Sequence, residues 1–265
     1  MKVLIADLPP LSIRAVAGVI GVSALLAIAL ARREKLGVPR AIWGRLTIVS
    51  LLNITGWMGF SSFSLLWLTA SEAIVVCYTV AVWAALFAWP ILGERPRWQR
   101  VLALVLAMGG ITLLVLGRGL DIGIAKLPGV AFGLASAIFF ALGTVLTKRW
   151  PLGLPPTTMV VWQVAIGCLP LGLGAMLLEA PEFGRLDAGG WLLVVYGGLV
   201  GLGVAYIPWF AALRRLPASV ASLGTLITPV VGVLAAVAFL GEPLGVREAL
   251  ALALTITGVV LAVRG

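Results

Sequence analysis

Nine long apolar runs dominate this sequence. A helix needs about 20 apolar residues to cross roughly 30 Å of hydrocarbon, and each run supplies about that many before a short segment rich in charge, Pro or Gly interrupts it. A soluble domain has about 25% charged residues, whereas this chain is 11% charged and 62% apolar. We therefore predict an all-α integral membrane protein with nine transmembrane helices, at residues 11–31, 46–68, 72–92, 98–116, 129–147, 157–178, 191–213, 218–240 and 246–263.

The composition argues against several other classes of protein. The net charge is +9, but the Lys and Arg residues lie in short clusters between the runs, so we expect no nucleic-acid partner. The sequence has no His, and Cys77 and Cys168 are isolated within apolar runs, as is typical of small buried side chains. The sequence presents no cluster of carboxylates or metal ligands. We therefore predict that the protein is not an enzyme and holds no cofactor or metal.

An internal duplication relates the two halves of the chain. A shift of 148 positions aligns residues 69–117 with 217–265, and 17 of these 49 pairs are identical, against about 5 expected by chance from the composition. The tripeptide LGE occurs in both copies, at residues 92–94 and 240–242. Paired helices lie five crossings apart, so they run in opposite directions. This predicts inverted repeats related by an axis in the membrane plane, an arrangement common in transporters.

One predicted helix, residues 129–147, has no partner in the first half. The tripeptide LPP precedes the first run and also its partner at 157–178, which places the missing partner upstream of Met1. We expect this sequence to lack the first helix of a five-plus-five ancestor, through a late start, a truncation or a genuine loss. The predicted domains are a first repeat at 1–117, an outer linker at 118–128 and a second repeat at 129–265.

The distribution of charge predicts an orientation. If the segment after the first run is cytoplasmic, 13 of the 19 Lys and Arg residues lie on the inner side and 6, with Arg14 among them, on the outer side. This asymmetry follows the positive-inside rule. It predicts a cytoplasmic C-terminus.

The second half carries a family resemblance. The segment VAYIPWFAALRRLPASVASLGTLITPVVGVLAAVAFLGEPL, residues 204–244, resembles the drug/metabolite transporter superfamily, EamA type, and LGERP at 92–96 extends the likeness to the first half. The resemblance implies ten helices in two inverted repeats, a central cavity between the halves, and export of metabolites, amino acids or drugs across a bacterial inner membrane. This sequence departs from it in having nine helices and in placing Ala81 where the second half has Pro229, so we expect the implied helix bend in only one half.

Polar and aromatic residues within the runs are candidates for lining a cavity, because a lipid-facing stripe would consist of Leu, Ile and Val. The candidates are Asn53, Trp57, Ser61, Tyr78, Thr79, Gln163, Tyr206, Trp209 and Thr225. The alternative is that they form hydrogen bonds between helices or anchor the protein at the membrane interface. Aromatic, hydroxyl and amide groups suit a small amphipathic solute that is neutral or cationic.

Charged residues are expected to stay out of the centre of the membrane. No Asp, Glu, Lys or Arg lies near the middle of a run, and a charge there is costly and normally retained for function. This argues against a buried anion site for phosphate or nucleotide-sugar substrates and against strict proton coupling through an embedded carboxylate. Glu72 is expected to occupy a solvated helix start rather than a cavity.

Prolines and glycines suggest hinges, helix ends and contacts. Pro208 and Pro229 each remove a backbone hydrogen bond inside a run, which makes them hinge candidates, although kinks can also merely shape packing. Glu94 and Glu242 are gate candidates through ion pairs with nearby arginines; the alternative is that each LGE segment ends a helix, with Gly93 and Gly241 left-handed. Two small-xxx-small pairs predict close helix packing: Gly129 with Gly133, and Gly197 with Gly201.

The leading hypothesis is a multi-pass membrane exporter or facilitator of small amphipathic metabolites, amino acids or drugs that works by alternating access. The alternative is a non-transporting membrane scaffold or degraded paralogue, whose cavity would be filled by side chains. Lipid and a small-molecule substrate are the expected partners, and a homodimer is left open.

Overall fold

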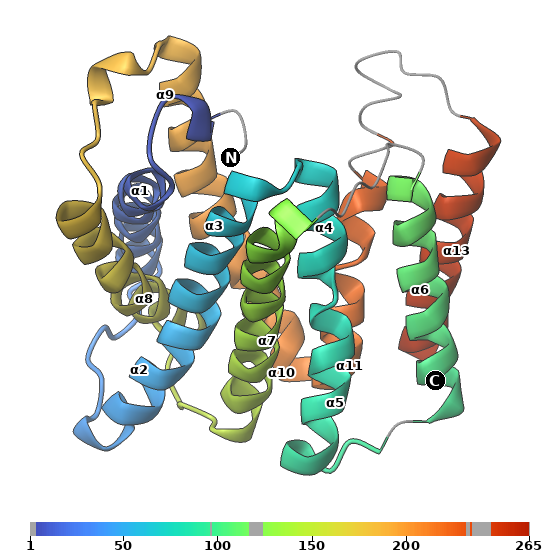
Figure 1. The fold of residues 1–265 in the computed structure, drawn as a ribbon. Helices are drawn as coiled ribbons and strands as arrows, with labels where there is room; N and C mark the ends of the chain where they lie inside the picture. The colour runs from blue at the N-terminus through green and yellow to red at the C-terminus, as the bar shows by residue number, and fades with distance from the viewer. Residues whose placement is uncertain (1–3, 96, 117–123, 232–233, 235–244, 265) are drawn as a thin grey trace.

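The protein is helical throughout the residues that the structure describes, and these residues contain no β-strand (Figure 1). The computed structural model describes residues 4–95, 97–116, 124–231, 234 and 245–264. The longer elements, in chain order, are α1 (Pro10–Ala31), α2 (Trp43–Ser50), η3 (Leu51–Gly59), α3 (Phe60–Trp67), α4 (Ala70–Tyr78), α5 (Val80–Leu92), α6 (Trp98–Leu116), α7 (Leu127–Arg149), α8 (Pro156–Leu178), α9 (Ala188–Tyr196), η6 (Gly197–Val204), α10 (Tyr206–Arg215), α11 (Ala218–Gly224) and α13 (Val246–Arg264).

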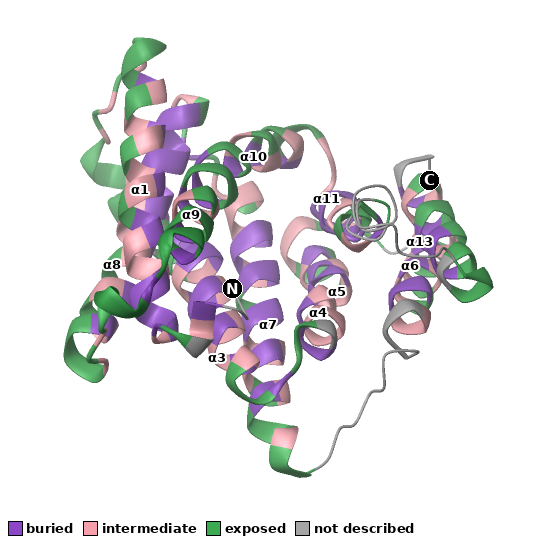
Figure 2. Cartoon of the chain, turned by 90° about the horizontal axis from the view of Figure 1, so that it is seen from above, coloured by how far each residue is buried: buried purple, intermediate pink, exposed green. Residues whose placement is uncertain are grey.

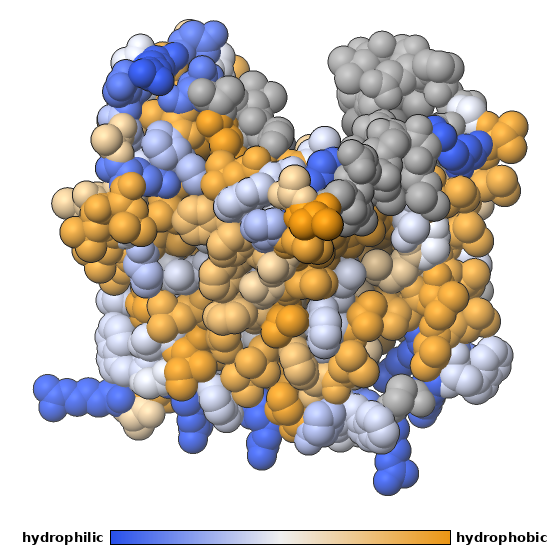
Figure 3. Space-filling model, viewed as in Figure 1, coloured by the Kyte–Doolittle hydropathy of each residue, from blue (hydrophilic) through white to orange (hydrophobic). Residues whose placement is uncertain are grey.

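The length and composition of these helices suit a membrane. Six helices of the described residues are long and apolar enough to cross one, and the shorter apolar helices Trp98–Leu113, Ala218–Val231 and Ala249–Ala262 coincide with the remaining predicted runs. The molecular surface carries an apolar band across its middle, with hydrophilic residues gathered toward both ends (Figure 3). The predicted class, an all-α multi-pass membrane protein, is confirmed.

Hydrogen bonds between connecting segments define a basic end of the bundle, the lower end in Figure 1. Arg214 Nη2 donates to the carbonyl of Leu154 over 3.0 Å, and Lys148 Nζ donates to the carbonyl of Leu216. Glu34 and Glu94 bind helix starts at this same end. The residues gathered there include most of the Lys and Arg of the described segments, which explains the charge asymmetry of the sequence.

Three glutamates join distant segments by capping helix N-termini, where backbone N–H groups lack partners within the helix. Glu34 accepts from the backbone of Thr158 at 2.8 Å, at the start of α8. Glu179 accepts from the backbone of Ser12 at 2.7 Å, at the start of α1. Glu94 accepts from the backbone of Ala218 at 2.9 Å, at the start of α11.

Helices α6 and α13 form a close pair at one side of the bundle (Figure 2). A Cβ atom on Gly110 would lie 2.6 Å from the Ala251 carbonyl oxygen, and one on Gly258 would lie 2.6 Å from the Ala103 carbonyl oxygen. Gly110 and Gly258 are aligned by the 148-residue shift of the duplication. Each glycine therefore permits a backbone contact with the partner helix.

The glycine predictions were right for one pair and wrong for the other. Gly129 and Gly133 of α7 lie against Trp67 and Val76, at 2.8 and 2.7 Å from a built Cβ, so close packing is confirmed there. By contrast, Cβ atoms on Gly197 and Gly201 would meet nothing within 4 Å among the described residues. The close contact from this helix is made by neighbouring Gly198, which packs on α1. The four-residue spacing predicted that Gly197 and Gly201 form the close contact, but Gly198 forms it instead.

Candidate functional site

Two membrane helices are broken at the level where a cavity lies. In the first half, α4 ends and α5 begins around Thr79, whose hydroxyl donates to the Val76 carbonyl over 2.6 Å. In the second half, α11 ends before Thr225, whose hydroxyl donates to the Ser222 carbonyl over 2.7 Å. The expectation of a bend in only one half was wrong, because the threonine hydroxyl takes part in a turn at Thr79 without a proline.

The cavity has a volume of about 270 Å³ and lies between these breaks. Its size is close to the lower end of the range of small-molecule pockets. Five of the nine predicted cavity residues are among its lining side chains. The lining consists of Trp57, Tyr78, Val80, Phe140, Ala205, Tyr206, Trp209, Thr225 and Thr228.

The cavity wall is largely aromatic. The ring of Phe140 on α7 lies 4.8 Å from that of Trp57 and 5.5 Å from that of Trp209, in each case between ring centroids. The indole Nε1 of Trp209 is buried and has no hydrogen-bond partner among the described residues. A buried donor without a partner costs free energy, so this group is available to an acceptor on a bound molecule.

Two segments of π-helix carry or precede lining residues. Segment η3 contains Trp57, and η6 leads directly into Ala205 and Tyr206. The sequence predicts that these two helices are partners in the duplication, and π-helical turns are frequently found at functional sites. The sequence pattern did not reveal them, because a π-turn widens the backbone without a residue-specific signal.

Four predicted cavity residues lie outside the lining and bond to protein instead. Asn53 Nδ2 donates to Gln163 Oε1 over 3.1 Å and to Thr147 Oγ1 over 3.0 Å, and both amide side chains are fully buried. Ser61 donates to the Met58 carbonyl, and Thr79 forms the turn described above. For Asn53 and Gln163, the alternative of hydrogen bonding between helices describes the observed contacts.

The two hinge candidates occupy different surroundings. Pro208 is exposed on α10, one residue before Trp209. Pro229 lies four residues after Thr225, so its missing N–H would have bonded the Thr225 carbonyl, at the break in this helix. Each proline is therefore a sequence neighbour of a residue that lines the cavity: Pro229 follows Thr228, and Pro208 precedes Trp209.

Of the two gate candidates, the structure describes one. Glu94 is half-buried and accepts hydrogen bonds from Ala218 and Ser219 at the start of α11. Gly93 ends α5 in the left-handed conformation, with φ of 73°, as predicted. Glu242 and Gly241 lie outside the described residues. Glu72 does start a helix, through a capping box with Thr69, but it is buried rather than solvated and pairs with Lys126 at 2.7 Å.

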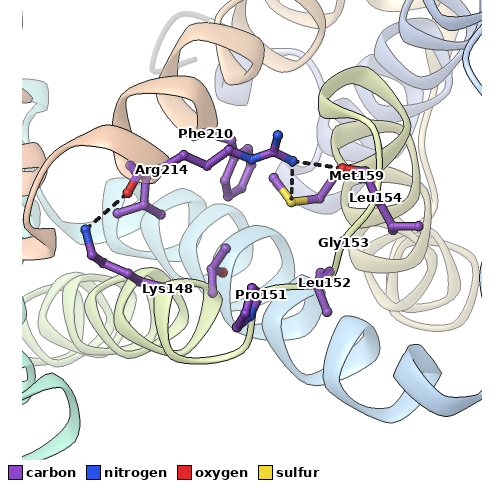
Figure 4. A pocket seen from close by; sticks show the side chains of 10 residues that line it. Lys148, Pro151, Leu152, Gly153, Leu154, Met159, Phe210 and Arg214 are labelled. Atoms are coloured by element: carbon purple, nitrogen blue, oxygen red, sulfur yellow. Dashed lines mark hydrogen bonds between the residues drawn. The ribbon is translucent and has the colours of Figure 1, made fainter.

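A second pocket, of about 470 Å³, opens at the basic end along α7 and α10 (Figure 4). Lys148 and Arg214 line it, and both reach backbone carbonyls across it or at its edge. Arg214 Nη2 also lies 3.8 Å from the Met159 sulfur. Thr147, which accepts from Asn53, belongs to this lining, so the buried amide cluster adjoins the pocket.

Sequence reasoning missed Arg14. It was counted among the charges of the outer side, yet it lies in the second turn of α1 and its Nε donates to Ser62 Oγ on α3 over 2.8 Å. Three titratable side chains on other helices, Tyr206, Cys168 and Cys77, lie within electrostatic range of its charge. The side chain therefore turns into the bundle, a direction that position along a helix does not reveal.

Comparison with known proteins gives consistent matches. The profile of the EamA-like transporter family matches residues 1–116 and 127–264. The uncharacterized transporter YvbV of Bacillus subtilis (strain 168) is 27% identical over 261 residues, which cover 98% of this chain and 84% of that protein. The uncharacterized transporter YoaV of the same organism is 24% identical over 230 residues, covering 87% and 79%.

A solved crystal structure has the same fold, with a TM-score of 0.82 at 23% identity over 96% of this chain and 89% of that one. The family profile covers nearly all of the sequence in two consecutive segments, and the two relatives are named as transporters. The chain belongs to the EamA-like transporter family.

Proposed function

We propose that this protein exports small amphipathic metabolites across a bacterial inner membrane by alternating access, with the basic end and the C-terminus in the cytoplasm. The observation that carries the proposal is the aromatic cavity between two broken helices. Interrupted helices near the membrane centre are a common way for transporters to build a solute site.

Both halves of the sequence contribute residues to the cavity lining, as alternating access requires. Trp57 and Tyr78 come from the first half of the sequence, whereas Trp209 and Thr225 come from the second. The two halves of the duplication are therefore both represented in the lining. If they rocked about this site, the wall would open first to one side of the membrane and then to the other.

The pocket at the basic end supplies a route on the proposed cytoplasmic side. Phe210 lines this pocket, and its neighbour Trp209 lines the central cavity. We infer that α10 separates the two spaces in this conformation. Such a separation corresponds to a closed inner pathway.

An unfilled cavity disfavours the alternative of a non-transporting scaffold, for which side chains would fill the space between the halves. The aromatic wall also carries an unpartnered indole donor in Trp209. A group of this kind suits recognition of a solute acceptor better than pure packing.

The test is transport by purified protein in proteoliposomes, with a panel of radiolabelled metabolites that includes amino acids, aromatic acids and amides. We expect at least one compound to show saturable flux. Trp209→Ala should raise its half-saturation concentration about tenfold, because the solute loses an aromatic wall and a donor. Trp89→Ala, which removes a tryptophan that is 56% exposed on α5, is the matched control and should leave flux unchanged. Absence of saturable flux across the panel would refute the proposal.

A further inference from the structure

Arg14 is a cation inside a membrane-spanning helix, with no carboxylate partner among the residues that the structure describes. It lies in the fifth position of α1, and its side chain is half-buried. Its Nε donates to Ser62 Oγ over 2.8 Å, and it forms no ion pair with any of the described residues. A hydroxyl compensates a guanidinium only in part, because the group has five N–H donors and a full positive charge.

Two carboxylates near this end of the bundle are already engaged. Glu179 binds the backbone of Leu11 and Ser12 at the start of α1. Glu72 binds Lys126 and the backbone of Thr69. Neither carboxylate is bonded to Arg14, and within the part of the chain that the structure describes no acidic residue forms an ion pair with it.

A charge in this position requires a reason. An arginine at the centre of a membrane helix costs about 2.5–3.5 kcal/mol on insertion scales, and such residues normally pair with a partner or mark a substrate pathway. Arg14 is nearer the helix start than the centre, where the cost is smaller, but its side chain does not extend toward solvent. It reaches into the bundle, to Ser62 on α3.

The surroundings of Arg14 connect it to the central cavity. Its bonding partner Ser62 lies on α3, which continues directly from η3 with the lining residue Trp57, and the lining residue Tyr206 lies within electrostatic range of its charge. Cys77, a second such neighbour, directly precedes the lining residue Tyr78. The guanidinium thus lies within electrostatic range of an aromatic cavity whose lining residues carry no charge of their own.

We infer that Arg14 binds the anionic group of the transported solute, so that the substrates are small amphipathic carboxylates whose apolar part lies against Trp57, Phe140 and Trp209. This rests on the proposed function and names its substrate class. It replaces the sequence-based expectation of a neutral or cationic solute. Guanidinium and carboxylate form charge-assisted, frequently bidentate hydrogen bonds, and the aromatic rings supply the apolar contact.

The test is equilibrium binding, measured without transport. Full-length protein in phosphatidylcholine nanodiscs is dialysed at neutral pH against matched radiolabelled pairs: 3-phenylpropionate with 3-phenylpropanamide, and indole-3-acetate with indole-3-acetamide. Each pair has the same apolar group and differs in charge. We expect at least one carboxylate to bind about tenfold more tightly than its amide, as hydrogen bonds to charged groups exceed neutral ones.

Substitutions of Arg14 test whether this residue causes the preference for carboxylates over amides. Arg14→Gln should bind both members of a pair equally, and Arg14→Lys should keep part of the preference because it keeps the charge. Arg40→Gln, which removes an exposed arginine from a connecting segment, should behave like the wild type. Size-exclusion chromatography and circular dichroism check that each variant is folded. The comparison of carboxylate with amide in the wild-type protein tests the inference even if a variant does not fold.

Three results would overturn the inference: equal binding of carboxylate and amide to the wild type, a preference that persists in folded Arg14→Gln, or no saturable carboxylate binding in any pair. Failure of the proposed function is distinguishable from these. Carboxylate binding without flux in proteoliposomes would refute transport alone, whereas flux of neutral solutes without carboxylate preference would refute the role of Arg14 alone.

Discussion

Glu34 and Glu179 make the same bonds at opposite ends of one helix pair. Glu34 accepts from the backbone and hydroxyl of Thr158, two residues after Pro156 begins α8. Glu179 accepts from the backbone and hydroxyl of Ser12, two residues after Pro10 begins α1. Each carboxylate follows the C-terminus of one helix and caps the N-terminus of the other. An antiparallel pair held in this way has the local two-fold relationship expected of inverted repeats.

Removing these caps should lower stability. Glu34→Gln and Glu179→Gln each replace a carboxylate with a neutral amide that binds N–H groups less strongly, and losing a helix N-cap costs about 0.5–2 kcal/mol. The two effects should add in the double variant, because the sites lie at opposite ends of the pair. Thermal unfolding in detergent measures them, with Glu182→Gln in an exposed ion pair as control. Wild-type midpoints for both single variants would contradict the prediction.

The Glu34 cap should also depend on pH. Burial raises the pKa of this carboxyl, but hydrogen bonds from Thr158 and Thr157 outweigh that effect and hold the pKa below its ordinary 4.5. Because the folded pKa is lower than the unfolded one, the stabilisation is complete above about pH 4.5 and is lost as pH falls through the folded value. The difference in unfolding midpoint between wild type and Glu34→Gln should therefore shrink below about pH 4.5. A difference that stays constant down to about pH 3 would exclude this linkage.

The α6–α13 contact should not tolerate a methyl group. Gly258→Ala places a Cβ atom 2.6 Å from the Ala103 carbonyl oxygen, a backbone atom that cannot rotate away. Overpacking of this kind costs about 1–3 kcal/mol. Gly109→Ala is the matched control, because its Cβ atom would meet nothing within 4 Å among the described residues and alanine favours helix. Equal unfolding midpoints for the two variants would show that the helices separate at this point.

Restoring the backbone donor at Pro229 should affect motion more than packing. Pro229→Ala supplies an N–H that can bond the Thr225 carbonyl and close the break beside the cavity. We expect a higher unfolding midpoint and slower flux in proteoliposomes, because a continuous helix bends less readily. The matched variant Pro170→Ala lies inside α8, away from the cavity lining, and should leave flux unchanged. Faster flux in Pro229→Ala would contradict a hinge role.

The sequence predicted the all-helical membrane fold and five of the nine residues that line the candidate cavity, for identifiable reasons. Hydropathy specifies helices because lipid requires every backbone group to be bonded internally, and aromatic residues such as Trp57 and Trp209 stood out within apolar runs. The direction of a side chain around a helix is set by tertiary packing. The sequence therefore does not predict that Arg14 turns into the bundle toward Ser62, and it groups Asn53 with cavity residues although Asn53 bonds to Gln163.

The capping glutamates were equally hidden. Glu34 follows a helix in the sequence and reads as a solvated loop charge, but its partners are Thr157 and Thr158 more than 120 residues away. The break at Thr79 has no proline to reveal it. Both features depend on neighbours that one sequence does not identify.

The most direct test of the account is the accessibility of the cavity from the two sides of the membrane. Thr225→Cys, introduced with Cys77 and Cys168 replaced by alanine, is exposed to a membrane-impermeant maleimide in oriented vesicles from one side at a time. The account predicts labelling from each side, and protection on both sides by a transported solute. Labelling from one side only, unchanged by any solute, would contradict a cavity that opens alternately across the membrane.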